Sequence, residues 1–279
     1  MKAHATPSIM GIININSNSF FKESRFTNSA AIEKRIHSMI EDGADIIDLG
    51  ACSTRPGSTP ITAEEEWDLL KDALNVIKKN FTAYNIRFSI DTFRSEIVKR
   101  AYGEIGDFIV NDISAGEDDI NMLKLVGELK LNYIAMHKRG TPENMQELTN
   151  YPNGVVNEVI EYFKNFDQKA AEFGITNYVI DPGFGFAKTL EQNYELFNGL
   201  PAIKKEIDQF CQKKRDILVG ISRKSMIYKA LNILPDESLE ATTALNLQAL
   251  LLGANILRVH DVKQAKQCCR LYELLSGNK

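Results

Sequence analysis

Eight short apolar runs recur along the chain, each followed by a polar residue, a loop and a segment with helical periodicity. These runs cover residues 9–13, 46–49, 88–90, 108–110, 133–136, 178–180, 217–221 and 256–259. Parallel strands that are covered on both faces have such near-continuous apolar sequences. Eight strand-and-helix units in 279 residues predict an α/β fold, a closed (β/α)8 TIM barrel that forms a single domain over residues 1–279. An open doubly wound sheet is the alternative.

Helix boundary signals support this alternation. Residues 62–65 read Thr-Ala-Glu-Glu, a capping box that opens a helical segment, and Gly253 stands where a later helix should end. Trp67, the only tryptophan, falls on the apolar stripe of the first segment, so we expect it in the core. Residues 155–173 mix apolar and charged positions, as an outer barrel helix does.

Composition restricts the class of protein. Hydrophobic residues make up 44% and charged residues 25%, as in globular proteins, and no apolar run is long enough to cross a bilayer. The net charge of −4 lacks blocks, which predicts no nucleic-acid partner, and the compact basic run 213–215 is interpreted as a solvated helix end. Residues 1–8 do not resemble a secretory signal and the four cysteines lack metal-ligand spacing. We therefore expect reduced thiols, no membrane partner and a cytoplasmic location.

A polar residue follows every one of the eight apolar runs. In a TIM barrel the carboxyl ends of all strands meet at one face, so these residues would converge on one cup. Taken alone, Asp48 and His137 are better explained as strand-end caps, whereas the whole set predicts a binding site. The set is Asn14, Asp48, Asp91, Asn111, His137, Asp181, Ser222 with Arg223 and Lys224, and Arg258 with His260.

The residue types in this cup suggest its ligands. Asp91, Asn111 and Asp181 offer acceptors and one amide, which suit the amino-pyrimidinone edge of a pterin or a purine. Two carboxylates in an apolar cup require complementary N–H groups or a nearby cation such as Lys224.

A second, basic group predicts an anion site. Arg55, Arg258 and His260 carry donors that match phosphate oxygens, and Asn14 offers an oxygen to a hydrated magnesium ion. Ser225 lies at the expected start of a helix, where unpaired N–H groups bind small anions.

Loop residues beside the cup predict a slot for an aromatic ring. Thr54, Pro56 and Phe186 are apolar or partly apolar. Phe186 belongs to the stretch 181–188, Asp-Pro-Gly-Phe-Gly-Phe-Ala-Lys, whose glycines let the backbone pass close to a flat ligand.

These motifs resemble those of dihydropteroate synthases, in order and along nearly the whole chain. They lie at residues 10–14, 48–57, 89–92, 110–113, 136–141, 181–188, 222–225 and 258–262. The resemblance implies a (β/α)8 barrel that condenses 6-hydroxymethyl-7,8-dihydropterin diphosphate with 4-aminobenzoate, giving 7,8-dihydropteroate and diphosphate, with Mg2+ as cofactor. It also implies folate biosynthesis, a homodimer and a target of sulfonamides, which mimic 4-aminobenzoate.

Each site of that family has matching positions in this sequence. The pterin-binding positions are Asp91, Asn111, Ile113, Met136, Asp181, Gly220 and Lys224. The diphosphate-binding positions are Asn14, which is also the metal ligand, Arg55, Arg258 and His260. The aminobenzoate-binding positions are Thr54, Arg55, Pro56, Phe186 and Ser225. The resemblance implies catalytic parts for Lys224, Asp91, Arg258 and Arg55.

The implied reaction is a substitution with considerable SN1 character. Magnesium and the basic group would stabilise the departing diphosphate, while the dihydropterin delocalises positive charge at its exocyclic methylene. The amine of 4-aminobenzoate attacks that carbon, so neither a protein nucleophile nor a strong general base is needed.

Two other classes share parts of this pattern. A methyltetrahydrofolate:corrinoid methyltransferase uses a related barrel and pterin edge, but does not need the Ser-Thr-Arg-Pro segment at residues 53–56 or the Ser-Arg-Lys-Ser segment at 222–225. A non-catalytic pterin-binding paralogue would bind the pterin diphosphate without turnover.

Two loops depart from the family pattern. The first usually reads Asn-Val-Thr-Pro-Asp-Ser-Phe, whereas residues 14–20 here read Asn-Ile-Asn-Ser-Asn-Ser-Phe. Ser17 in place of proline leaves more conformational freedom to lose on closing, and Asn18 removes a charge. In the second loop, Ala51 and Cys52 replace the usual Gly-Glu.

The combined substitution Asn16→Thr, Ser17→Pro and Asn18→Asp is expected to lower the KM for 4-aminobenzoate. The proline reduces the entropy that the loop loses when it orders over the substrate. Steady-state kinetics of dihydropteroate formation would measure the effect, and kinetic constants identical to those of the parent protein would refute it.

Overall fold

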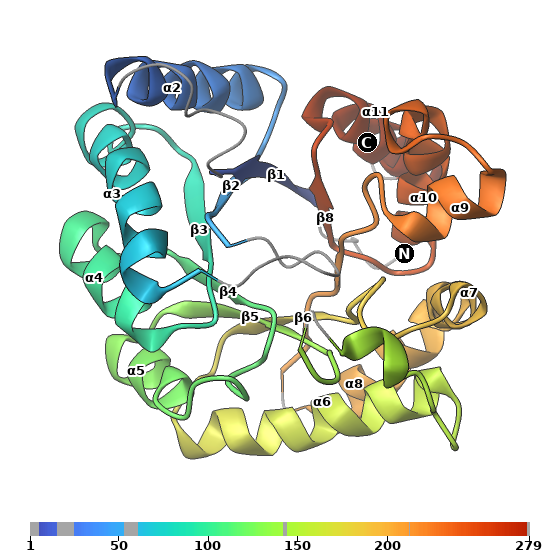
Figure 1. Ribbon diagram of the computed structural model, residues 1–279. Coiled ribbons are helices and arrows are strands. Elements are labelled where there is room, and N and C mark those ends of the chain that lie inside the picture. Colours follow the sequence, from blue (N-terminus) through green and yellow to red (C-terminus); the bar gives the residue numbers. More distant parts are fainter. Residues whose placement is uncertain (1–5, 16–24, 53–60, 142–143, 212, 278–279) are drawn as a thin grey trace.

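The computed structural model describes residues 6–15, 25–52, 61–141, 144–211 and 213–277. Its strands are β1 (Ser8–Asn14), β2 (Ile46–Gly50), β3 (Arg87–Asp91), β4 (Ile109–Asp112), β5 (Asn132–Met136), β6 (Tyr178–Asp181), β7 (Leu218–Val219) and β8 (Ile256–Val259). They form one parallel sheet in the order β6-β5-β4-β3-β2-β1-β8-β7, and a bridge between Ile180 and Ile217 joins its two edges. The sheet closes as a (β/α)8 barrel (Figure 1), which confirms the predicted fold and rules out the open sheet.

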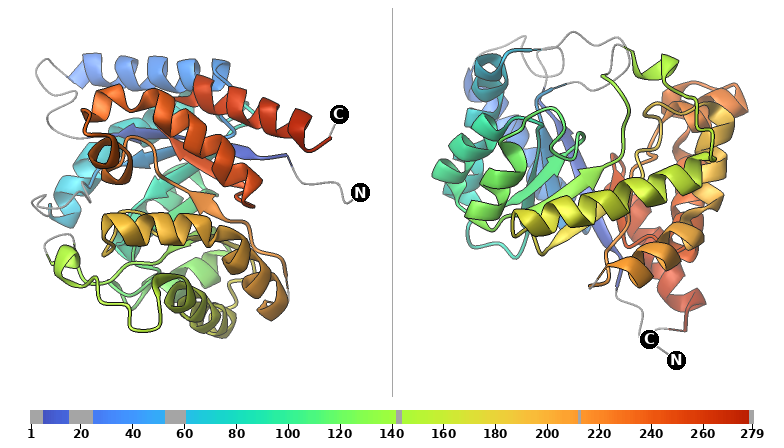
Figure 2. Two further views of the ribbon diagram at one scale, coloured as in Figure 1. Left: turned by 90° about the vertical axis from the view of Figure 1, so that its right-hand side faces the viewer. Right: turned by 90° about the horizontal axis from the view of Figure 1, so that it is seen from below.

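Helices surround this ring of strands on the outside (Figure 1). They are α2 (Arg25–Glu41), α3 (Ala63–Asn80), α4 (Ser95–Ile105), α5 (Met122–Leu129), α6 (Val155–Glu172), α7 (Leu190–Asn198), α8 (Leu200–Phe210), α9 (Ser225–Leu231), α10 (Leu239–Leu251) and α11 (Val262–Leu275), with short 3-10 turns η1 (Met145–Glu147) and η2 (Pro235–Glu237). Figure 2 shows that β1 begins and α11 ends at the end of the barrel opposite η1.

The predicted helix signals are present. The Thr62 side chain accepts from Glu65 N and the Glu65 carboxylate accepts from Thr62 N, so the capping box of α3 is complete. Trp67 is partly buried against the core, and the Arg100 guanidinium stacks over its ring at 4.3 Å. The apolar run 217–221 forms a shorter strand than expected, because Lys224 N donates to Ile221 O and the chain already turns there.

Arg215 corrects the prediction of a solvated basic run. Only Lys213 and Lys214 are exposed, whereas Arg215 is 7% exposed. Its Nη2 lies 3.0 Å from Asp167 Oδ1 and its guanidinium stacks 3.9 Å from the centre of the Tyr178 ring. A planar, weakly hydrated guanidinium can be buried when it is paired and stacked, and sequence position alone does not reveal the partner.

Two expectations drawn from composition can be compared with the described residues. None of the described helices is long and apolar enough to span a membrane. All four cysteines, Cys52, Cys211, Cys268 and Cys269, are free thiols, as predicted.

Two helical glycines provide a matched test of the packing between α5 and the end of α6. A Cβ atom on Gly127 would lie 1.9 Å from Phe173 O, whereas nothing lies within 4 Å of one on Gly103. Gly127→Ala should therefore lower the free energy of unfolding by about 1–3 kcal/mol, as overpacking does. Gly103→Ala should raise it by about 0.5–1 kcal/mol through helix propensity. Urea unfolding of both variants measures this, and equal effects would contradict the packing described.

Candidate active site at the barrel mouth

One apolar layer fills the interior of the barrel and sets which residues face its mouth. The layer contains Met10, Ile46, Ile109, Ile134, Leu218 and Ile256, with Val179 packed against it. Side chains alternate along a strand, so the residue two places further on faces the same interior, one step nearer the carboxyl end. These next positions are Ile12, Asp48, Asn111, Met136, Gly220, Arg258 and Asp181. The floor of the mouth is therefore apolar and the layer above it is largely polar.

Arg258 is the cation at the centre of this polar layer. Its Nη2 lies 2.6 Å from Asp91 Oδ2 and 2.6 Å from Asp48 Oδ2, and its Nε donates to Asp48 Oδ2 at 2.8 Å. Asn111 Nδ2 donates to both carboxylate oxygens of Asp48, at 3.2 and 3.4 Å. Four residues from β2, β3, β4 and β8 thus form one hydrogen-bonded network across the barrel.

Burial and charge act in opposite directions on this network. Burial raises the pKa of Asp91 to about 7, while the Arg258 guanidinium lowers it and the neighbouring Asp48 raises it further. Arg258 stays charged, because the two carboxylates outweigh the burial that would lower its pKa. A nearby cation such as Lys224 was expected to compensate Asp91 and Asp181; Lys224 does act on Asp181, whereas the ion pairs with Asp91 and Asp48 belong to Arg258.

The turn after β6 forms the other side of the mouth. Asp181 Oδ1 accepts from Gly183 N at 2.8 Å, and burial raises the pKa of this carboxyl while Lys224 opposes the rise. Lys224 Nζ donates to Phe184 O at 2.7 Å and lies 5.0 Å from the centre of the Phe186 ring. Burial lowers the pKa of Lys224 to about 8, and Asp181 acts against it. A carboxylate, an ammonium and an aromatic ring therefore stand together.

Other predicted pocket residues have defined positions. Met136 and Ile113 are buried, with 2% and 6% of their surface exposed. Gly220 faces Arg258, and a Cβ atom there would lie 3.7 Å from Arg258 Cβ. Ser225 is the first residue of α9, directly after Lys224.

Asn14 and His260 line a separate cavity of about 470 Å3 between β1, β8 and α2. Lys34 and Arg35 of α2 line it too, and Arg35 Nη2 donates to His260 O at 3.0 Å. These two basic residues were missed, because helical periodicity alone does not show which helix face meets a strand end. Arg258, grouped with Asn14 and His260 from the sequence, instead binds the carboxylates.

The described residues contain no cluster of three or more His, Cys, Asp or Glu side chains that could hold a metal ion. Asn14 is exposed at the end of β1 and presents one amide oxygen. Magnesium usually keeps several waters and takes its remaining ligands from one or two protein oxygens and the substrate phosphates. The residues present fit such a substrate-carried ion rather than a protein cage.

Thr54, Arg55 and Pro56 lie outside the described residues, as do the first-loop positions 16–18. His137 does not face the cup, because it follows Met136 and alternation turns it toward α6, where its ring meets that of Tyr162 at 4.9 Å.

Arg223 also points away from the cup. It takes a left-handed φ of 56° and pairs with Asp261 through Nε and Nη2, at 3.0 and 2.8 Å. The side chain of Ser222 is likewise engaged locally, because its Oγ accepts from His260 N at 3.3 Å.

Cys52 occupies the position at which the family pattern has glutamate. Its thiol accepts a hydrogen bond from Arg94. Arg94 pairs with the fully buried Glu66 of α3, donates to Cys52 Sγ at 3.2 Å and donates to Ile61 O at 2.5 Å. Burial raises the pKa of the Cys52 thiol to about 12, so it remains protonated. No sequence pattern indicated that Arg94 would link Glu66 and Cys52.

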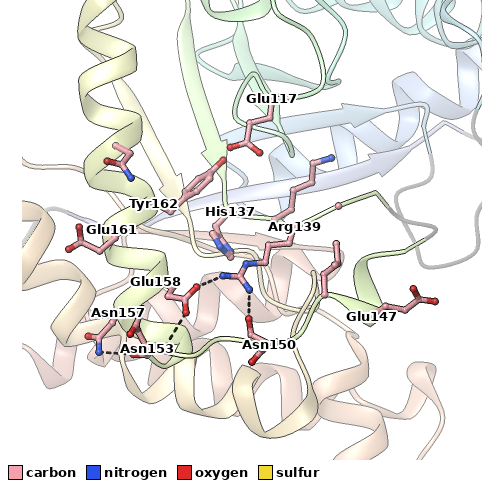
Figure 3. A pocket seen from close by; sticks show the side chains of 14 residues that line it. Glu117, His137, Arg139, Glu147, Asn150, Asn153, Asn157, Glu158, Glu161 and Tyr162 are labelled. Carbon is pink, nitrogen blue, oxygen red and sulfur yellow. Dashed lines mark hydrogen bonds and ion pairs between the residues drawn. The ribbon is translucent and has the colours of Figure 1, made fainter.

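A cavity of about 840 Å3, here called the outer cavity, lies between the segment after β5 and α6 (Figure 3). Arg139 spans it, pairing with Glu158 and donating to Asn150 O at 2.5 Å. His137 and Tyr162 form part of its wall. Asp91, Asn111, Asp181 and Lys224 do not line it, so we place the candidate site at the mouth.

Comparison with known proteins identifies the class. A family model described as pterin binding enzyme matches residues 10–260, so the chain belongs to the pterin-binding enzyme family. Dihydropteroate synthase of Streptococcus pyogenes serotype M6 is 39% identical over 260 residues, covering 92% of this chain and 91% of that protein. The chain spans about half (49%) of a mitochondrial folate synthesis bifunctional protein of Arabidopsis thaliana, at 36% identity.

Solved structures agree with this assignment. Dihydropteroate synthase of Clostridium difficile, crystallised in the presence of pteroic acid, has a TM-score of 0.87 and 31% identity, with 99% of each chain covered. The Xanthomonas albilineans enzyme with 4-aminobenzoic acid has a TM-score of 0.84 and 30% identity, covering 98% of this chain and 94% of that one. Within the family, the chain therefore groups with the dihydropteroate synthases, which are transferases.

Arg258→Met tests the central network. Leaving two buried carboxylates without their cation should lower the free energy of unfolding by about 3–5 kcal/mol. The folded-state pKa of Asp91 already exceeds its unfolded value, so its stabilising contribution is present at low pH and lost as pH rises through the folded pKa. The loss should therefore be larger at about pH 8 than at about pH 5 in urea unfolding.

Arg270→Met is the matched control for this experiment. Arg270 is exposed and pairs with Glu273 on the surface, so its removal should change stability by about 0–1 kcal/mol at either pH. An Arg258→Met loss that is equally small, or equal at both pH values, contradicts the network described.

Proposed function

We propose that the chain is an active dihydropteroate synthase that condenses 6-hydroxymethyl-7,8-dihydropterin diphosphate with 4-aminobenzoate, giving 7,8-dihydropteroate and diphosphate. The observation that carries this proposal is the polar layer at the mouth: Asn111 and Asp181 belong to the interior-facing row above the apolar layer, and Asp91 is paired in register with Asn111 and bound to Arg258 of that row. The long match to dihydropteroate synthases supports the same activity.

Asp181, Asn111 and Asp91 bind the amino-pyrimidinone edge of the pterin in this proposal. The edge offers N–H donors, and buried carboxylates require such donors. Met136, Ile113 and Gly220 form the walls, since the first two are apolar and the third leaves room beside Arg258. Lys224 stands between the Asp181 side and the Phe186 ring, where an ammonium can bind a ring nitrogen or carbonyl oxygen.

Asn14, Arg55, Arg258 and His260 are proposed to bind the diphosphate. Arg258 reaches it by exchanging one of its present carboxylate partners when the pterin N–H groups take over that carboxylate. Asn14 would help to hold Mg2+, and the ion would supply neutralisation of the charge on the leaving group.

Thr54, Arg55, Pro56, Phe186 and Ser225 are proposed to hold 4-aminobenzoate. Phe186 supplies a ring face, and Ser225 lies at the N-terminus of α9, where unpaired N–H groups favour a carboxylate. This substrate is the one that sulfonamides mimic, and a 4-aminobenzoic acid complex is known for the Xanthomonas albilineans enzyme.

Catalysis in this proposal comes from charge placement and orientation. Arg55, Arg258 and Lys224 stabilise charge as the diphosphate leaves, and Asp91 holds the pterin that carries the developing cation. The amine of 4-aminobenzoate is unprotonated near neutral pH and attacks directly, so orientation and exclusion of water are the main requirements. No covalent enzyme intermediate is expected.

The proposal also covers the domain organisation, the oligomeric state and the location of the protein. The chain acts as one domain over residues 1–279, as a homodimer and in the cytosol. The closed single sheet supports the first, and the family resemblance supports the second. The four free thiols fit a reducing compartment.

The alternatives are less well supported. The long match is to dihydropteroate synthases, which disfavours the corrinoid methyltransferase. A non-catalytic paralogue predicts pterin diphosphate binding without product, and an assay separates it from the enzyme.

Purified protein with both substrates and Mg2+ should form dihydropteroate. Asp181→Asn and Lys224→Met should each weaken pterin diphosphate binding by about a hundredfold, because each removes a buried charged hydrogen-bonding group. Calorimetry measures binding, and product formation measures turnover.

Lys214→Met removes an exposed lysine and should behave as the parent protein. Binding without any product in the parent protein would support the paralogue, and unchanged pterin binding in both site variants would refute the proposed pocket.

A further inference from the structure

The turn after β6 contains three residues with left-handed backbone conformations, and one of them is not a glycine. Gly183, Gly185 and Ala187 have φ values of 74°, 83° and 50°. A residue with a Cβ atom is disfavoured in this left-handed region, so the surroundings must hold Ala187 there. A Cβ atom on Gly183 would lie only 1.9 Å from His137 O, which shows that the turn rests directly on the backbone after β5.

Side chains from separate elements bind the carbonyl oxygens of this turn. The Tyr151 hydroxyl donates to Ala187 O at 3.1 Å, and Lys224 Nζ donates to Phe184 O at 2.7 Å. The shape of the turn therefore depends on neighbours rather than on a regular backbone ladder.

Lys188 makes the densest of these contacts. Its Nζ lies 2.9 Å from Gly183 O, 2.9 Å from Phe186 O and 3.0 Å from His137 Nδ1, and the residue is 3% exposed. An ammonium has three N–H donors, and here it meets three acceptors. Burial lowers the pKa of His137 well below its usual value, so the neutral imidazole can accept at Nδ1.

We infer that Lys188 is a positioning residue for the transfer reaction: supported by His137, its ammonium fixes the turn that carries Phe184 O and the Phe186 ring. Those two groups in turn orient Lys224, through a 2.7 Å hydrogen bond and a 5.0 Å cation–ring contact. This inference rests on the proposed function. Lys188 would then influence both substrate pockets through the turn, although its own side chain contacts neither of the reacting atoms.

The contacts between Lys188 and the turn depend on pH, because the groups around Lys188 change the pKa of its ammonium. Burial lowers the pKa of Lys188 to about 7; Asp181 of β6 acts against this, while Lys224 and Arg139 add to it. Above that pH the neutral amine has two N–H donors for three acceptors, so one contact with the turn is lost.

The His137 ring, which contacts Lys188 through Nδ1, also faces two tyrosines. The ring is 6.1 Å from that of Tyr151 and 4.9 Å from that of Tyr162, and burial raises the pKa of the Tyr151 hydroxyl to about 12. Figure 3 shows His137 between Arg139 and Tyr162 at the wall of the outer cavity. Of the groups in direct contact with His137, Lys188 is the one whose charge changes near neutral pH, and Lys224, on the other side of the turn, has a pKa of about 8.

Lys188→Met tests the inference by kinetics across pH. The KM values for both substrates should rise by about tenfold while kcat changes less, because the turn is misplaced but the leaving-group contacts remain. In the parent protein kcat/KM should fall as pH rises through about 7, and the part of this fall that comes from Lys188 should be absent from the variant, while Asp91 and Lys224 continue to titrate near pH 7 and 8. A purely structural lysine would not shift the pH profile.

Two substitutions of His137 test the same contact with Lys188 in place. His137→Asn keeps an acceptor atom at the position of Nδ1, whereas His137→Leu removes it. His137→Leu should approach the KM values of Lys188→Met, and His137→Asn should stay within about threefold of the parent protein.

Lys138→Met is the matched control, since Lys138 is 4% exposed and pairs with Asp118 at 2.5 Å without contacting the turn. It should lower stability without altering the pH profile.

Parent-like kinetic constants and an unchanged pH profile in Lys188→Met, or equal values for the two His137 variants, would overturn the inference. If Lys188→Met does not fold, the two His137 variants decide the question. Failure of the parent protein to form product would instead overturn the proposed function, and calorimetric binding of pterin diphosphate to the same variants across pH would then decide about Lys188.

Discussion

Arg258 bound between Asp48 and Asp91 is the interaction on which the mouth of this barrel depends. Two carboxylates at that depth are tolerated because one guanidinium reaches both, at 2.6 Å each. In the proposed complex, a ligand with N–H donors binds one of these carboxylates, and Arg258 loses that partner. The guanidinium that stabilises the two carboxylates is also the group that we propose to bind the departing diphosphate.

The barrel itself determines which residues join this network. Parallel strands present every second side chain to the interior, and the apolar layer from Met10 to Ile256 fixes the phase of each strand. A polar residue two positions further on must then face the mouth. A residue one position further along faces the outside instead. His137 is such a residue, because it directly follows the interior-facing Met136.

This alternation also explains how much could be read from the sequence. Eight runs with polar ends were enough to predict the barrel and to place Asp91, Asn111, Asp181 and Arg258 at one face. His137 was assigned to the cup wrongly, although counting from Ile134 would have placed it on the outer face.

Contacts across the barrel could not be predicted, because they depend on which long side chains meet. The partners of Arg258, the burial of Arg215 and the contacts of Lys188 are of this kind. The basic residues of α2 beside Asn14 were missed for the same reason.

A crystal structure with 6-hydroxymethyl-7,8-dihydropterin diphosphate bound would show whether Arg258 exchanges its carboxylate partners for the phosphates. The pterin ring should lie above the apolar layer, with its amino-pyrimidinone edge on Asp181 and Asn111 and with Arg258 moved toward the phosphates. A pterin bound in the outer cavity beside Tyr162, with Arg258 still holding both Asp48 and Asp91, would contradict this prediction.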